Sequence, residues 1–354
     1  MWPRTDLLEL LGISHPIIQA PMSGFTSPAL VAAVSNAGAL GSLGCTGLPA
    51  QTMRDQIQEI RRATNRSFNV NFLVYPPPRI DSDAARRVRQ RLAAYYDEFG
   101  LGAVPEPSDP LPRLDEERIQ LVLDARPRVV SFHFGLPPAD TLTRIKQMGA
   151  VVLSSATTVA EARRLEAEGA DAIIAQGLEA GGHRGTFTPG DGAGLIGTMA
   201  LVPQVADAVH VPVIAAGGIA DGRGIAAAFA LGASGVQIGT AFLGCPEALV
   251  PAVHRDALRR AADEDTRLTR VLTGRPARAL RNRLIDEMGD KETLEFPAQG
   301  SLIRPLFQGN NDAARAACLP LWAGQAAPLV RDLPAAKLIE TLVAESLARL
   351  PGRA

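Results

Sequence analysis

Residues 211–242 read VPVIAAGGIADGRGIAAAFALGASGVQIGTAF, and this stretch decides the fold. An apolar run at 212–218 ends in two glycines, a segment with helical periodicity follows at 221–231, and a second apolar run follows at 234–239. A buried strand, a helix and a second buried strand in this order are typical of a parallel sheet covered by helices. We therefore expect a βαβ unit here.

The same alternation recurs along most of the chain. Eight short apolar runs are predicted to be strands, at 16–20, 39–43, 68–74, 128–133, 149–155, 171–176, 212–218 and 234–239. Helices are predicted between them at 28–37, 50–63, 138–147, 158–168 and 221–231. Eight such units predict an α/β fold of the closed (β/α)8 type, a TIM barrel. A doubly wound open sheet is the main alternative, but no G-x-G-x-x-G motif follows the first strand.

Two segments lie outside this alternation. Residues 75–127 form an insertion after the third strand, with a proline-rich start and an arginine-rich helix expected at 81–98. Residues 246–354 are predicted to be a mostly helical C-terminal extension, because they are too many for a βα loop. The barrel itself would then comprise 1–74 and 128–245. We expect the extension to cover a substrate site.

The extension contains an arginine-rich segment. Nine arginines lie between Arg255 and Arg283, interleaved with aspartates and glutamates. Mixed charges of this kind usually form a solvated helical face. We therefore expect these arginines to be exposed on helices rather than to bind anions.

Composition excludes several classes of protein. With 36 basic and 37 acidic residues, the net charge of -1 argues against a nucleic-acid partner. No apolar run approaches the roughly 18 residues of a membrane span, and the N-terminus lacks an apolar signal region, so we expect a cytoplasmic protein. Neither the three cysteines nor any Asp, Glu or His cluster has the spacing of metal ligands, so no metal is expected. A homodimer is the oligomeric state that we expect.

Glycines follow the last two strands of the predicted barrel. Gly217 and Gly218 end one of them, and Gly239 and Thr240 end the other. In TIM barrels, backbone N–H groups of these two turns often converge on a phosphate together with a helix N-terminus. The alternative is that both glycine pairs only make tight turns. We expect a phosphate site, which needs no lysine.

Amide side chains lie on three other strands, two of them at strand ends and Asn71 within the third strand. Gln19, Asn71 and Gln176 could bind the polar edge of a planar ring above the barrel. Together with the phosphate site they predict a flavin mononucleotide (FMN) site. Each amide could equally be a satisfied polar residue of the core, and Asn69 is as well explained that way.

Several motifs of the chain resemble the nitronate monooxygenase family. These are QAPMSG, FNVNFLV, VVSFHFGLP, QGLEAGGHRGTF, the stretch 211–242 and, near the C-terminus, LWAGQ. The resemblance runs from about residue 14 to 245, with a weaker echo at 321–325. It implies an FMN-dependent barrel in which the histidine of the AGGH motif, His183, acts at the substrate carbon. The FMN contacts that the resemblance implies are Met22, Asn71, Gln176, Gly181, Gly218, Gln237, Gly239 and Thr240.

Among the histidines, His183 is predicted to be the catalytic base, because imidazole has the basicity to remove a proton next to a nitro group near neutral pH. His133 also ends a strand, and we predict a substrate contact there, with a structural histidine as the alternative. The other histidines, His15, His210 and His254, are expected to be structural or on the surface.

The function predicted is oxidation of nitronates by O2 to carbonyl compounds and nitrite, including nitroalkanes first deprotonated by the histidine base. The alternative is an NAD(P)H-dependent FMN reductase acting on a quinone or an enoyl thioester. A flavin- or phosphate-binding protein without catalysis also stays open. An inosine-monophosphate dehydrogenase-like reaction is disfavoured, because the loop after the sixth strand has no cysteine. Phe296, Phe307 and Trp322 are the expected lining of the substrate pocket.

Overall fold

A computed structural model describes residues 1–188, 194–309 and 311–350. Within these ranges, eight parallel strands form one sheet in the order β1-β9-β8-β6-β5-β4-β3-β2, and a bridge between Ile18 and Leu40 joins the first strand to the last. The strands are β1 (Ile17–Gln19), β2 (Gly41–Gly44), β3 (Phe68–Leu73), β4 (Val129–His133), β5 (Val151–Ala156), β6 (Ala172–Gln176), β8 (Val213–Ala216) and β9 (Gly235–Ile238). The TIM barrel and its eight predicted strands are thereby confirmed.

The predicted ranges of the barrel and the extension include residues that lie outside the described ones, namely 189–193, 310 and 351–354. In the part that is described, no helix has the length and apolarity needed to cross a membrane.

Helices cover the outside of the barrel. They are α2 (Pro28–Asn36), α3 (Ala50–Ala63), α5 (Glu116–Ala125), α6 (Ala139–Gln147), α7 (Val159–Ala167), α8 (Thr198–Ala206) and α9 (Gly222–Ala230), with α1 (Asp6–Leu11) at the N-terminus and η1 (Thr240–Gly244) and η2 (Ala327–Leu329) as short 3-10 turns. The start of α2 follows from its sequence, because the Ser27 hydroxyl accepts the Leu30 N–H at 3.0 Å. Sequence patterns did not predict α5, which lies within the segment 75–127. This helix packs against the barrel helices α3 and α6.

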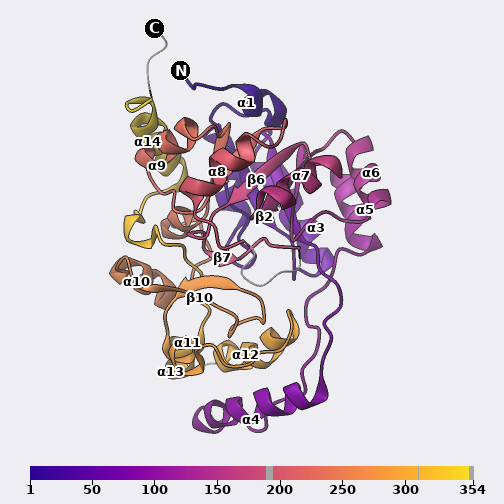
Figure 1. Ribbon diagram of the computed structural model, residues 1–354, viewed down its shortest axis with the longest axis vertical. Helices are drawn as coiled ribbons and strands as arrows, with labels where there is room; N and C mark the ends of the chain where they lie inside the picture. Colours follow the sequence, from indigo (N-terminus) through magenta and orange to yellow (C-terminus); the bar gives the residue numbers. More distant parts are fainter. Residues whose placement is uncertain (189–193, 310, 351–354) are drawn as a thin grey trace.

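A second layer lies at one end of the barrel (Figure 1). It consists of α4 (Ser82–Glu98) from the insertion together with α10 (Ala252–Arg260), β10 (Thr266–Thr269), β11 (Ala277–Leu280), α11 (Arg283–Met288), α12 (Ala298–Gln308) and α13 (Asp312–Cys318) from the extension. Leu92 and Tyr96 of α4 are buried in one apolar cluster with Ile285 and Leu302 of the extension. The Tyr96 hydroxyl also donates to the carbonyl of Leu302 at 2.8 Å. The insertion and the extension therefore share one apolar core. We call the layer that they form together the cover layer.

The cover layer contains strands that the sequence patterns missed. β10 and β11 form an antiparallel hairpin, and β11 also pairs with β7 (Gly182–His183) from the loop after β6. The expectation that the arginine-rich segment is a solvated helical face is wrong for this hairpin. Arg278 lies in β11, is only 6% exposed and donates to the carbonyl of Leu178 at 3.0 Å. Its guanidinium thus binds a backbone carbonyl of the barrel loop and the Thr266 hydroxyl of β10 instead of facing water.

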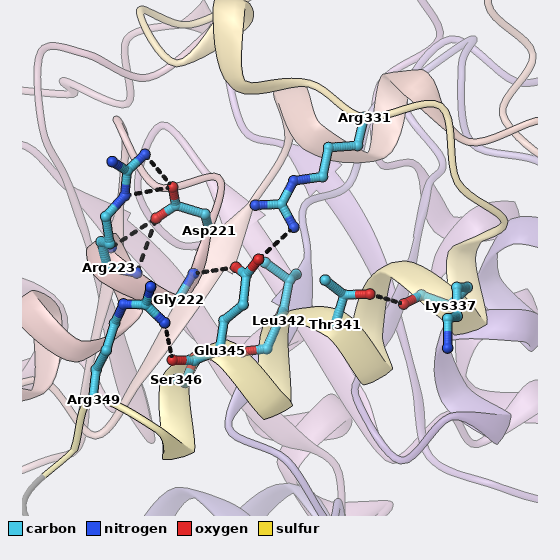
Figure 2. A network of polar contacts seen from close by, with 11 residues as sticks. Asp221, Gly222, Arg223, Arg331, Lys337, Thr341, Leu342, Glu345, Ser346 and Arg349 are labelled. Carbon is cyan, nitrogen blue, oxygen red and sulfur yellow. Dashed lines mark hydrogen bonds and ion pairs between the residues drawn. The ribbon is translucent and has the colours of Figure 1, made fainter.

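The last helix, α14 (Ala335–Leu347), returns to the barrel and packs on α2 and α9. Figure 2 shows the polar contacts that hold it there. Glu345 accepts the Gly222 N–H at 3.0 Å and pairs with Arg331 at 2.7 Å. Asp221 caps α9 by accepting the Arg223 N–H at 2.9 Å. Two carboxylates thus satisfy the N-terminus of α9.

Close approach of α14 to α9 depends on Gly222. A Cβ at this position would lie 2.4 Å from the Cβ of Glu345 and 2.5 Å from its carbonyl carbon. We therefore expect Gly222→Ala to lower the free energy of unfolding by about 1–3 kcal/mol, measured by urea denaturation. Gly300→Ala in α12 is the matched control, since its Cβ would meet only one carbonyl oxygen at 3.8 Å. Equal stability of the two variants would contradict the packing argument.

Candidate active site

The loop after β6 holds His183 in a small sheet with the cover layer. His183 is paired with Ala277 and Gly182 with Arg278, so β7 is the edge strand of the hairpin. The Arg184 N–H extends this pairing by donating to the carbonyl of Pro276 at 2.8 Å. His183 is therefore fixed by backbone hydrogen bonds between the barrel and the extension.

The His183 side chain is half-buried among aromatic rings. Its ring centroid lies 5.2 Å from that of Phe296, 5.4 Å from that of Trp322 and 5.9 Å from that of Phe134. The Nε2 atom lies 2.9 Å from the Thr273 hydroxyl oxygen. Phe296 and Trp322 thus contact His183, and their lining of a substrate pocket stays a prediction, whereas Phe307 packs between the barrel core and the cover layer.

The surroundings keep the His183 imidazole neutral. Burial, followed by repulsion from His133 when that ring is protonated and from the charge of Arg275, lowers the pKa of His183 to about 3. The ring therefore has no proton on one nitrogen at neutral pH. It is available to accept a proton or a hydrogen bond.

His133 and Gln176 hold the backbone of the same loop. His133 Nε2–H donates to the carbonyl of His183 at 3.1 Å, and Gln176 Nε2 donates to the same oxygen at 2.9 Å. Gln176 Oε1 accepts the Gly185 N–H at 2.7 Å. Burial lowers the pKa of His133 to about 4, so its other nitrogen is unprotonated. Both side chains thereby position the loop. For His133 this is the structural alternative to the predicted substrate contact, whereas Gln176 was expected to bind the cofactor.

Two buried charged side chains hydrogen-bond to the backbone of the same loop. The Arg184 guanidinium is 2% exposed and donates to the carbonyls of Gln176, Gly177 and Gly194 at 2.6–2.8 Å. The Glu161 carboxylate accepts the N–H groups of Phe187 and Thr188 at 2.7 and 3.1 Å. These bonds satisfy carbonyls and amides that the irregular loop would otherwise leave unpaired.

Arg275 is the functional candidate that the sequence did not reveal. Its guanidinium carbon lies 3.5 Å from the centroid of the Phe134 ring, and its NH2 group donates to the carbonyl of Thr186. The only sequence signal was its membership of the arginine-rich segment, which we had expected to be solvated. Pairing of β7 with β11 brings this cation beside His183.

The glycine turns after β8 and β9 lie next to this loop. Gly217 and Gly218 have φ of +111° and +73°, which side chains rarely adopt. Within the described ranges, the N–H groups of Gly218, Gly239 and Thr240 donate no hydrogen bond. A Cβ on Gly239 would meet only the Ala20 Cβ at 3.5 Å and the Met22 sulfur at 4.0 Å. Met22 therefore lies beside a turn whose donors are free.

The C-terminal LWAGQ motif packs on the same loop. A Cβ on Gly181 would lie 2.5 Å from the Gly324 nitrogen, so the two backbones touch. The Gly324 N–H donates to the Thr240 hydroxyl at 2.9 Å, and the Gln325 N–H donates to the carbonyl of Glu179 at 2.9 Å. The weak echo at 321–325 is thus part of the site.

The other predicted residues lie as follows. Asn71 is buried and donates to the Ser131 hydroxyl at 2.9 Å, and Gln237 on β9 has a buried Oε1 without a partner in the described residues. His254 is fully buried against Phe25, as a structural histidine would be. Across the ranges that the structure covers, no group of three or more His, Cys, Asp or Glu side chains is arranged to hold a metal.

Comparison with known proteins agrees with this geometry. The family model described as nitronate monooxygenase matches residues 4–345. A nitronate monooxygenase of Pseudomonas aeruginosa is 45% identical over 95% of this chain and 97% of its own length. One of Paraburkholderia phytofirmans is 43% identical over 97% of this chain and 95% of its own.

Solved structures are similar as well. The nitroalkane oxidase of Streptomyces ansochromogenes superimposes with a TM-score of 0.88 at 39% identity, over 97% of this chain and 98% of that one. FabK of Thermotoga maritima superimposes with a TM-score of 0.75 at 31% identity, over 98% and 96%. The chain therefore belongs to the nitronate monooxygenase family and is a flavin-dependent oxidoreductase of that family.

Proposed function

We propose that this protein uses FMN to oxidise nitronates with O2 to carbonyl compounds and nitrite, with His183 as the base that serves neutral nitroalkanes. The observation that supports this most is the placement of a neutral His183, among aromatic rings, on the loop that packs against two glycine turns whose N–H donors have no partner among the described residues. Nitronate oxidation is the activity named for the relatives that are 43–45% identical.

The residues present fit FMN. Free N–H groups of Gly218, Gly239 and Thr240 suit a phosphate, and the unpartnered Oε1 of Gln237 suits an N–H donor of a ring. The helix N-terminus that the phosphate site was expected to use is taken at α9, where Asp221 and Glu345 accept its N–H groups. The helix N-terminus that remains beside these turns for a phosphate is the start of η1 at Thr240. Bound there, FMN would supply the electron-accepting and O2-reactive chemistry.

The other predicted FMN contacts have less freedom. Asn71 Nδ2 is engaged by Ser131, and both ends of the Gln176 amide are engaged by the loop 183–185. We infer that Gln176 acts on the flavin through the loop it positions. Gly181 and Gly217 serve by close backbone packing, since added Cβ atoms would lie 2.5 and 3.0 Å from neighbouring backbone nitrogens.

His183 handles the proton of a nitroalkane, and Thr273 orients it. A hydrogen bond between Nε2 and the Thr273 hydroxyl fixes the ring plane, which leaves Nδ1 for the substrate. A base whose pKa is about 3 removes a proton from carbon with little driving force, since each pKa unit corresponds to about 1.4 kcal/mol. Nitronates, which have already lost this proton, are therefore the favoured substrates.

Replacement of the base separates the two substrate classes. We expect His183→Asn to abolish nitrite release from a neutral nitroalkane and to spare turnover of the matching preformed nitronate, because only the former needs a proton acceptor. Steady-state assays of nitrite with both substrates measure this. His210→Asn, on the exposed surface, is the control. If His183→Asn turns over both substrates like the wild type, His183 is not the base.

The low pKa of His183 determines the pH dependence. The neutral base is fully present above about pH 5 and is lost only as the pH falls through the lowered pKa of about 3. The kcat/KM for a neutral nitroalkane should therefore stay level from about pH 5 to 7. If kcat/KM instead declined toward acid pH with an apparent pKa near the ordinary histidine value of about 6.5, the ring would not be as buried as described.

Gly239 tests the phosphate turn. Its φ of -107° suits an alanine, so Gly239→Ala should leave the apoprotein as stable as the wild type. The added methyl group would hinder approach of a phosphate to the N–H groups, so FMN should bind at least about 10-fold more weakly while riboflavin binding changes less. Fluorescence titration of apoprotein measures both affinities. Equal losses for FMN and riboflavin would argue against a phosphate site in this turn.

The similarity to FabK supports one alternative, an NAD(P)H-dependent reductase of a quinone or enoyl thioester. Rapid anaerobic bleaching of the bound flavin by NADH or NADPH would favour this reaction. Slow bleaching, together with nitrite release from nitronates in air, would favour nitronate oxidation.

A further inference from the structure

Arg275 is a half-buried cation without an acidic partner. Among the described residues, no carboxylate lies within ion-pair distance of its guanidinium. The nearest acid that acts on it is Glu161, and that carboxylate is occupied by Thr157, Phe187 and Thr188. Burying a charge is costly unless a partner compensates it. Among the described residues, this cation therefore has a capacity for an anion that no side chain fills.

Only one edge of the guanidinium is used. The NH2 group donates to the carbonyl of Thr186, and the face stacks on the Phe134 ring at 3.5 Å. No other N–H group of the guanidinium has a partner in the described part of the chain, while the backbone N–H of Arg275 donates to the Thr273 hydroxyl. A guanidinium has five N–H donors in a planar fork. The stacked face fixes its plane, so a pair of parallel N–H donors remains in a defined orientation.

This free edge lies on the loop that also contacts His183. Thr273 and Arg275 are two residues apart between β10 and β11, and the Thr273 hydroxyl lies 2.9 Å from His183 Nε2. Phe134, on which Arg275 stacks, meets the His183 ring edge-on at 5.9 Å. The Arg275 guanidinium and the His183 imidazole thus both contact the Phe134 ring, and the charge of Arg275 lies close enough to act on His183.

We infer that Arg275 binds the planar two-oxygen head of the anionic substrate and so selects nitronates over neutral nitroalkanes. This inference rests on the proposed function for the identity of the substrate. A nitronate is planar and spreads its charge over two oxygens, which matches a guanidinium fork as a carboxylate does. Burial lowers the pKa of Arg275 to about 10, so it stays charged at neutral pH.

The first test compares Arg275→Met, Arg275→Lys and, as a control, Arg270→Met in the same loop, where Arg270 is exposed. In Arg275→Met holoenzyme, the KM for a nitronate should rise about 10- to 100-fold, whereas the KM for the matching nitroalkane changes less than about threefold. The KM of Arg275→Lys for the nitronate should lie between those of the wild type and Arg275→Met, because lysine keeps the charge and lacks the guanidinium fork. Flavin content and melting temperature of each variant show whether it is folded.

The second test needs no turnover. Nitrate is a planar, unreactive anion with two oxygens on one edge, and its affinity for the holoenzyme is measured by calorimetry. We expect about 10-fold or weaker binding in Arg275→Met and unchanged binding in Arg270→Met. Nitrate that fails to bind the wild type, or binds Arg275→Met equally well, would overturn the inference. So would a shift of the flavin reduction potential in Arg275→Met without loss of nitrate affinity.

These outcomes are separate from the proposed function. If the wild type releases no nitrite from any nitronate and nitrate still binds through Arg275, nitronate oxidation is wrong and the anion site stands. If nitrite is released normally and Arg275→Met binds nitrate and nitronate as tightly as the wild type does, the anion site is wrong and the function stands.

Discussion

The pairing of β7 with β11 is the constraint on which the rest of the site depends. Two residues from a barrel loop, Gly182 and His183, become the edge of a hairpin that belongs to the C-terminal extension. Backbone hydrogen bonds set the position of the histidine, and the same hairpin brings Thr273 and Arg275 to it. A loop of the barrel alone would leave this imidazole free to turn.

Burial and charge act together in this site. The cover layer removes water from His183 and His133, and Arg275 adds positive potential, so both effects favour neutral imidazoles. The same cation favours an anionic substrate, and a bound anion would in turn restore basicity to the histidine. An electrostatic arrangement of this kind suits a substrate that arrives already deprotonated.

Much of the fold was predictable because its physical cause is local. Apolar runs with flanking glycines predicted all eight barrel strands, and the α2 cap at Ser27 was visible in the sequence. The glycine turns were found because loops after barrel strands form such sites, and His183 was singled out by the resemblance of its AGGH motif to the family. In contrast, α5 was missed inside a proline-rich segment, and the strands β7, β10 and β11 are too short to show a period. FMN as the cofactor and a homodimer as the assembly stay predictions.

By itself, the sequence determined the barrel, the loop that holds the histidine and the family. Strand periodicity and glycine positions are local properties, so they can be read from neighbouring residues. Tertiary contacts alone reveal that an arginine expected in solvent packs on Phe134, and that Gln176 and His133 hydrogen-bond to the loop backbone. These roles depend on contacts between residues seven to about ninety positions apart, which residue type and spacing do not encode.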